Sequence, residues 1–418
     1  MSYYAVDFGT SNSLLSHVST DGKITPIPLD PNTGPVLKSL LYTPAQNQWF
    51  FGTEAVSEYV NQQGEGRFLR SIKKFLPEPN YTGTSIHNRN FNISEMVAVF
   101  LGEMRKRANK FTGRNVEKII LGRPALYSLD PQHDFLAQER MQKACELASF
   151  KEVTFCPEPI AAGLDYRSDE KKEKIVLITD FGGGTSDFTL MRFHNRPYSK
   201  EDILGLSGIF LAGDALDGLM MKDFISPHFG SQFEYRLPGG NNILQFPRNL
   251  LKKLCSPAHI THLKEKDTWE FLQHINKFGL SSLDQRRMKN LLTLVECQLG
   301  FPLFYEIEKT KVNLGTDDSS VFSYSFLDMT VEQKIEGNHY QKSVMPTINE
   351  VIAIMMDVFV QSGLSVSDVD QVCLTGGTSQ FPLIKEKLTA IFGKDKLVEH
   401  NIYQSVVNGL ALFAQKLP

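Results

Sequence analysis

The sequence predicts an α/β protein built from two duplicated halves. Two segments, AVDFGTSNSLLS from Ala5 and ITDFGGGTSDFTL from Ile178, share a pattern of apolar strand, Asp-Phe-Gly, small polar tip and second strand. Strand-like and helix-like stretches alternate between them, as in α/β units. At ~150 residues per domain, 418 residues suffice for about two or three domains. We therefore expect each half to form one α/β unit.

The first half is expected to span residues 1–174. It opens with a β-hairpin, because the run YYAVDF before its turn is rich in residues that favour strands. Residues 118–121, KIIL, are typical of a buried strand. Asp130 followed by Pro131 predicts a helix start, since Asp caps helices and Pro suits their first position. The charged stretch SDEKKEK at 168–174 predicts the boundary between the halves.

The second half is expected to span residues 175–418 and to open with the second hairpin. Residues 215–335 are rich in aromatic and loop-forming residues, which predicts an inserted subdomain whose helical tract is interrupted at Pro302. A Thr-x-x-Glu capping box at Thr347 then predicts a helix that ends at Gly363. The remaining elements are expected to be a strand at 369–374, a helix at 382–392 and a last helix at 405–414.

Composition narrows the class of protein. Hydrophobic residues make up 41% and charged residues 22%, as in ordinary globular chains. The net charge of -3 offers no basic excess for nucleic acid. The five cysteines form no C-x-x-C pair, and the start MSYYAVDFGTSNS lacks the basic and apolar regions of a signal peptide. The apolar run VIAIMMDVFV is too short to span a membrane. We expect a cytoplasmic protein without nucleic-acid or membrane partners.

The two Asp-Phe-Gly turns are candidate phosphate sites. Their glycines leave backbone N–H groups free to approach an anion, and Asp7 and Asp180 supply the oxygen charge that Mg²⁺ needs, through water. Each turn could instead be only a tight hairpin. The second copy and the Gly376-Gly377 turn favour phosphate binding. The hydroxyl donors at the tips are Thr10, Ser11 and Thr185.

Other nucleotide motifs are absent from the sequence. It contains no G-x-x-x-x-G-K-[ST] loop, and Asp187 stands where a third Rossmann glycine would follow Gly182 and Gly184. No HRD accompanies the DFG strings. The chain is therefore neither a P-loop protein nor a protein kinase.

An ordered set of motifs resembles the nucleotide-binding domain of DnaK-type heat-shock chaperones, within the actin-like ATPase superfamily. The motifs, spread over nearly the whole chain, are VDFGTSNS, RSIKKF, CPEPIAAGLDY, DFGGGTSDF, LAGDALD and LTGGTSQFPLI. The resemblance implies an actin-like ATPase fold, with two duplicated ribonuclease-H-like lobes and inserted subdomains around a central nucleotide cleft. It also implies ATP, Mg²⁺ and slow hydrolysis that changes the angle between the lobes.

The resemblance assigns four catalytic residues: Lys73, Glu158, Asp180 and Thr185. Lys73, expected on a strand, would bind the γ-phosphate and the attacking water, and Glu158 would orient that water or the metal shell. Lys73 could instead be a solvated cation in the basic run RFLRSIKK. Glu158 could simply begin the helix IAAGLDY.

The resemblance also assigns nucleotide contacts. They are Asp7, Gly9, Thr10, Ser11, Asn12, Gly182, Gly183, Gly184, Gly213, Glu308, Lys311, Gly376, Gly377, Thr378 and Gln380, with Asp7 and Asp180 as the water-mediated metal pair. Glu308 and Lys311 share one helix face and would meet a ribose, although they could be an exposed ion pair. Val312, Gly315 and Gln380 depart from the family pattern. Because Gln380 lacks a planar cation, the departure implies weaker adenine binding.

The chain length implies a particular subgroup. The sequence stops at LALFAQKLP, where the full chaperones would add a linker, a peptide-binding domain and a helical lid. It therefore resembles the short YegD-like relatives. The expected function is a Mg²⁺-dependent, chaperone-like ATPase whose lobe closure gates a protein partner or co-chaperone. The alternatives are a nucleotide-sensing module with negligible turnover and a small-molecule kinase of the same superfamily.

Overall fold

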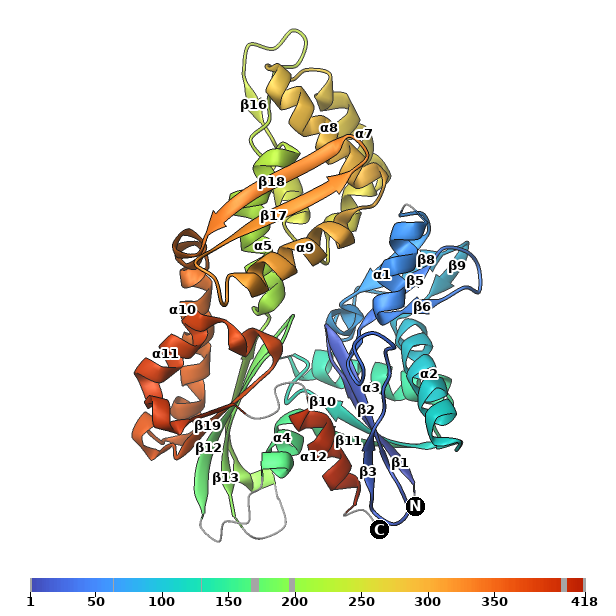
Figure 1. Cartoon of the computed structure of the whole chain (residues 1–418), viewed down its shortest axis with the longest axis vertical. Coiled ribbons are helices and arrows are strands. Elements are labelled where there is room, and N and C mark those ends of the chain that lie inside the picture. Colours follow the sequence, from blue (N-terminus) through green and yellow to red (C-terminus); the bar gives the residue numbers. More distant parts are fainter. Residues whose placement is uncertain are drawn as a thin grey trace.

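A computed structural model describes residues 2–62, 64–128, 130–166, 173–194, 200–399 and 404–415. It contains two lobes side by side, each with a mixed β-sheet at its base and a smaller body above it (Figure 1). The predicted α/β class is therefore confirmed.

The sheet of the first lobe has the strand order β11-β10-β1-β2-β3. Strands β1 and β2 form an antiparallel hairpin, while β1 and β10 run parallel, with Tyr4 opposite Ile119. Its members are β1 (Tyr3–Phe8), β2 (Asn12–Val18), β3 (Ile24–Pro26), β10 (Lys118–Arg123) and β11 (Glu152–Pro157), with β4 (Leu37–Lys38) paired to β2.

The sheet of the second lobe repeats this topology in the order β14-β13-β12-β19-β20. Strands β12 and β13 form the hairpin, and β12 runs parallel to β19, with Val176 opposite Gln371. The repeated sequence pattern thus corresponds to a repeated chain path. Its members are β12 (Lys174–Phe181), β13 (Ser186–Phe193), β14 (Ile203–Ile209), β19 (Gln371–Thr375) and β20 (Leu397–Glu399).

Helices cover the outer faces of the sheets, and two helices lie between them (Figure 1). The outer helices are α2 (Ile93–Thr112), α3 (Pro131–Leu147), α10 (Gly337–Ser362) and α11 (Pro382–Phe392), and the inner pair is α4 (Glu158–Tyr166) and α12 (Ser405–Ala414). Helix α12 packs on α4 and on β1 of the first sheet, although it comes from the end of the chain. The inner pair crosses so closely that a Cβ on Gly409 would lie 1.6 Å from the carbonyl oxygen of Ala161.

The smaller bodies are insertions above the sheets (Figure 1). In the first lobe the insertion contains β5 (Leu40–Thr43), β6 (Phe50–Phe51), α1 (Gly52–Asn61), β7 (Arg67–Arg70), β8 (Thr84–Ile86) and β9 (Arg89–Phe91). In the second lobe it contains α5 (Gly213–Met220), β15 (Glu234–Tyr235), β16 (Leu244–Gln245), α6 (Arg248–Leu254), α7 (Lys266–Asn276), α8 (Ser282–Glu296), α9 (Gly300–Asn313), β17 (Ser319–Phe326) and β18 (Met329–Glu336).

Helix α10 corrects one local expectation. It begins at Gly337, not at the capping box of Thr347, and continues through Pro346 to the expected end at Gly363. Its buried face extends upstream of the proline to Tyr340 and Val344, so packing outweighs the cost of the lost hydrogen bond. By length and composition this helix could cross a membrane, but it packs against β13 and β14 as a core helix does.

Other local expectations agree more closely with the structure. Helices α11 and α12 have the expected bounds, and Asp130 caps α3 through the N–H groups of Gln132 and His133. The helical tract near Pro302 breaks between α8 and α9, and the proline lies in the first turn of α9. Most of the predicted boundary at 168–174 lies outside the described residues, so the division into halves stays a prediction.

Candidate functional site

Two matching glycine turns face each other between the lobes. In each, the N–H of the first glycine donates to a carbonyl three residues on: Gly9 to Asn12 at 3.1 Å, and Gly182 to Thr185 at 2.9 Å. The tips approach closely, because a Cβ on Gly183 would lie 1.9 Å from Ser11 Oγ. A side chain on Gly183 would therefore have to displace the side chain of Ser11 in the facing turn.

The start of α5 and the turn after β19 support the second glycine turn. The N–H of Asp214 donates to the carbonyl of Gly183 at 2.7 Å, and Thr378 Oγ1 donates to that of Gly182 at 2.7 Å. Gly376 has φ 77°, and a Cβ there would lie 2.5 Å from Asp180 Oδ1. The start of α5 and the turn after β19 thus hold the second glycine turn in place through these contacts.

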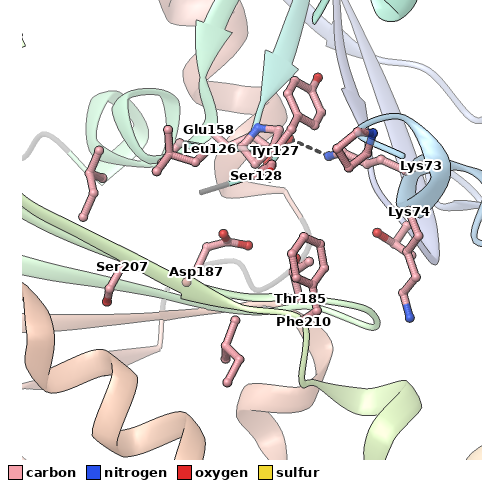
Figure 2. A pocket seen from close by; sticks show the side chains of 17 residues that line it. Lys73, Lys74, Leu126, Tyr127, Ser128, Glu158, Thr185, Asp187, Ser207 and Phe210 are labelled. Carbon is pink, nitrogen blue, oxygen red and sulfur yellow. Dashed lines mark hydrogen bonds and ion pairs between the residues drawn. The ribbon is translucent and has the colours of Figure 1, made fainter. Parts of the chain in front are cut away.

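Lys73 lies in a buried ion pair. It belongs to a 3₁₀ helix, Ile72–Phe75, which follows β7, so the expectation of a strand is wrong. The chain turns at Ser71, whose φ is 55°. The Nζ atom of Lys73 donates to Glu158 Oε1 at 2.9 Å, and the two side chains are only 12% and 13% exposed (Figure 2). The alternative of a solvated lysine does not fit this geometry, whereas Glu158 both begins α4 and binds the lysine.

The base of the cleft carries excess negative charge. Burial, with the charges of Glu158 and Asp180, raises the pKa of Asp7 to about 8. Burial and Glu158 raise the pKa of Asp180 to about 6. Burial acts to lower the pKa of Lys73, but Glu158 and other neighbours hold it above its usual value. Three carboxyl groups share one lysine, so a bound cation would stabilise their ionised forms.

Asp187 is a half-buried carboxyl group whose only significance in the sequence was its place at the position of a third Rossmann glycine. It lies opposite Asp180 in the hairpin register and projects from β13 into the pocket that contains Lys73, Glu158 and Thr185 (Figure 2). Burial and the charge of Asp180 raise the pKa of Asp187 to about 7, although a hydrogen bond with Thr185 acts to lower it. The signal in the sequence was a second Asp that mirrors Asp180 across the Gly-Gly-Gly-Thr turn.

A second pocket extends from the turns toward α9. The expected nucleotide contacts that line it are Thr10, Ser11, Asn12, Gly182, Gly183, Gly213, Glu308, Lys311, Gly377 and Thr378. Glu308 and Lys311 do not pair with each other. Lys311 Nζ lies 2.8 Å from Asp217 Oδ1, and Glu308 lies 3.7 Å from Lys38 of the first lobe. Burial raises the pKa of Asp217 to about 6 even beside this lysine.

Five expected contacts do not line that pocket. Asp7 is in β1, Gly9 and Gly184 belong to the two glycine turns, and Gly376 belongs to the turn after β19. A Cβ on Gly184 would lie 3.0 Å from Thr10 Cγ2 of the facing turn. Gln380 also does not line the pocket, and its Oε1 accepts a hydrogen bond from Lys385 Nζ at 2.9 Å. The structure therefore brings the phosphate-side residues together and leaves Gln380 engaged elsewhere.

Contacts between the lobes close the cleft. Asp214 pairs with Lys74 at 2.7 Å and with Arg70 at 3.3 Å. Burial acts to raise the pKa of Asp214, but these two cations hold it below its usual value. Phe68 stacks on Phe301 with ring centroids 4.1 Å apart. Arg70, Lys74 and Asp214 lie in the motifs RSIKKF and LAGDALD, but the sequence did not predict that they would pair, because the two motifs are distant along the chain.

Comparison of the sequence with known proteins identifies the family of this chain. The sequence model of the Hsp70 protein family matches residues 55–229 and 302–417. The chain is 23% identical over 415 residues to the chaperone protein DnaK of Mesomycoplasma hyopneumoniae (strain J), covering 97% of this chain and 57% of that protein. It is 22% identical to DnaK of Halobacterium salinarum (strain ATCC 29341) over 97% of this chain and 54% of that protein.

A third relative is the chaperone protein HscA of Buchnera aphidicola subsp. Baizongia pistaciae, 22% identical over 99% of this chain and 70% of that protein. The chain thus spans a little over half the length of the two DnaK relatives. The residues matched by the family model include the second hairpin and both members of the Lys73–Glu158 pair. The chain belongs to the Hsp70 family and corresponds to its nucleotide-binding domain.

Proposed function

We propose that this protein binds ATP with Mg²⁺ in the cleft and hydrolyses the ATP slowly. The observation that carries the proposal is the pair of facing glycine turns, with Lys73 and its buried carboxylates at their base. Backbone N–H groups at such turns suit phosphate oxygens. Membership of the Hsp70 family supports the same activity.

The residues at the base of the cleft fit a magnesium ion. Burial, together with the charge of Glu158, raises the pKa of both Asp7 and Asp180, against the opposing effect of Lys73. Hard oxygen ligands, directly or through water, are those that Mg²⁺ prefers. When bound, the ion would neutralise charge on the phosphates. The nucleotide and these aspartates would then share the site without like-charge repulsion.

Four side chains are proposed to act on the γ-phosphate. Lys73 would stabilise the charge that develops there, held in place by Glu158. Thr185 would hydrogen-bond to the phosphate from the second turn. Asp187 is suited to accept a proton from the attacking water, because a base works best when its pKa is near the working pH.

The adenosine would occupy the second pocket beside Glu308 and Lys311. Lys311 is already paired with Asp217, so Glu308 is the freer partner for a ribose hydroxyl. Val312 lines the same pocket and is largely exposed. With no stacking cation at Gln380, we expect modest affinity for the base.

Nucleotide-dependent movement of the lobes is proposed to gate a protein partner or co-chaperone. The ion pairs of Asp214 and the Phe68–Phe301 stack are the contacts that such movement would break. We further propose that the protein belongs with the short YegD-like members and acts in the cytoplasm. A nucleotide sensor and a small-molecule kinase are the competing functions.

An assay that follows both ADP formation and phosphate release, with purified protein, Mg²⁺ and ATP, distinguishes the three functions. ADP and phosphate formed in equal amounts with water alone, at a rate that falls by roughly 100-fold in Asp187→Asn, support the ATPase. ADP formation that depends on an added hydroxyl or carboxylate acceptor, without release of phosphate, supports the kinase. Formation of neither product, together with calorimetric binding of ATP, supports the sensor. No binding of ATP would contradict the proposal altogether.

A further inference from the structure

A groove lies beside the phosphate turns, on the side of the second lobe. We name it the α5–α6 groove, after the helices that form two of its walls. Three leucines and four cations characterise its lining: Leu211, Leu219, Leu251, Lys74, Lys222, Arg248 and Lys252. Its volume of about 630 Å³ lies within the usual range for small-molecule sites.

One wall of the groove belongs to a segment outside the family match. Residues 230–301 are not among those that match the Hsp70 model, and α6 lies within them. Lys74 and Phe210 line both the α5–α6 groove and the pocket that contains Lys73. The groove is therefore a second concave site that adjoins the nucleotide cleft and is lined in part by residues outside the family match.

The charge around this groove is one-sided. Arg248 and Lys252 are exposed and four residues apart on α6, so they share one face of that helix. Within the described part of the chain, neither has an ion-pair partner. The acidic side chain that lines the groove is Asp214, and it is already bound by Lys74 and Arg70. The lining thus combines exposed cations with half-buried leucines.

We propose that the α5–α6 groove binds a small amphipathic anion, a carboxylate with an aliphatic or aromatic body. The apolar body would cover Leu211, Leu219 and Leu251, which removes apolar surface from water. The carboxylate would lie at the rim and accept charge-assisted hydrogen bonds from Arg248 and Lys252. A neutral or cationic ligand of the same shape would lack that second contribution.

The test is isothermal titration calorimetry of the full chain without nucleotide, using decanoate, decanol and decylamine below their aggregation concentrations. Because nucleotide is omitted, failure here and failure of ATP binding are separate results. We expect saturable binding of one decanoate, with decanol and decylamine weaker by about tenfold or more. No saturable decanoate binding, or equal binding of the three probes, would overturn the proposal.

Surface variants locate the site. Arg248→Gln with Lys252→Gln should weaken decanoate binding by on the order of tenfold. The matched control, Arg286→Gln with Lys289→Gln, removes two exposed cations of α8 that do not line the groove and should change affinity less than about twofold. Both pairs replace exposed side chains, so folding is expected to be intact in thermal melts. An equal loss of affinity in both pairs would show nonspecific attraction of the anion and reject the groove.

Discussion

Lys74 Nζ lies 2.7 Å from Asp214 Oδ2, an ion pair that joins the first lobe to the second across the cleft. The backbone N–H of Asp214 also donates to the carbonyl of Gly183 in the second glycine turn. Closure of the lobes and the position of this turn are therefore mechanically linked. A nucleotide that orders the turn would also favour the closed arrangement.

Removing this link should speed nucleotide release. In Lys74→Ala the closed arrangement loses roughly 1 kcal/mol, so we expect dissociation of a fluorescent ADP analogue to be about fivefold faster. Stopped-flow displacement measures this rate. Lys106→Ala, which replaces a lysine that is 80% exposed on α2, is the control and should match the wild type. Identical rates in all three proteins would mean that the pair does not hold the lobes together.

Lys73 is expected to be needed for hydrolysis more than for binding. Lys73→Ala should reduce single-turnover hydrolysis by roughly 100-fold, as loss of a positioned charge-stabilising donor does, with ATP affinity within about tenfold. Lys106→Ala is again the control, because Lys74 itself contacts the site. A Lys73→Ala enzyme that turns over at the wild-type rate would remove this lysine from the mechanism.

Asp187 should control the pH dependence of hydrolysis. Its pKa is about 7, and a general base works only when deprotonated, so the rate should rise with pH to a plateau above this value. Bound Mg²⁺ would move the midpoint to lower pH. Asp187→Asn should abolish the inflection and lower the rate by roughly 100-fold. The check is a pH series of single-turnover rates, and an unchanged inflection in Asp187→Asn would assign it to another group.

Binding of ATP should depend on divalent metal. Without it, Asp7 and Asp180 face the phosphates as like charges in a buried site, so we expect affinity in EDTA to fall by about tenfold or more. Calorimetric titration with ATP, in EDTA and then with Mg²⁺ restored, measures the difference. Equal affinity in the two buffers would exclude a metal site at these aspartates.

The crossing of α4 and α12 should tolerate no side chain at Gly409. A methyl group there meets the carbonyl of Ala161, so Gly409→Ala should lower the free energy of unfolding by about 1–3 kcal/mol. Gly102→Ala in α2 is the matched control, since its methyl meets nothing within 4 Å. There the better helix propensity should raise stability by about 0.5–1 kcal/mol. Urea denaturation measures the free energy of unfolding of both variants. An unchanged value in Gly409→Ala would mean that the two helices can move apart at little cost.

Much of the local structure could be predicted from the sequence. The bounds of α11 and α12 follow from nearby residues, such as Pro382 at a helix start, and the two hairpins follow from strand-forming runs around Gly turns. The glycine turns themselves pointed to phosphate chemistry. These features depend on backbone preferences within a few residues, which a sequence displays directly.

The sequence by itself therefore determined the repeated α/β plan, the turns and most helix ends, whereas tertiary packing decided the rest. Helix α10 continues through Pro346 because its face is buried on both sides of the proline, and α12 packs on the first sheet. Lys311 pairs with Asp217 and not with Glu308. Packing also brought Lys74 to Asp214, 140 residues away along the chain. The physical reason is range: a buried charge or apolar face is stabilised by whichever partner the fold brings near, and local sequence contains no record of that partner.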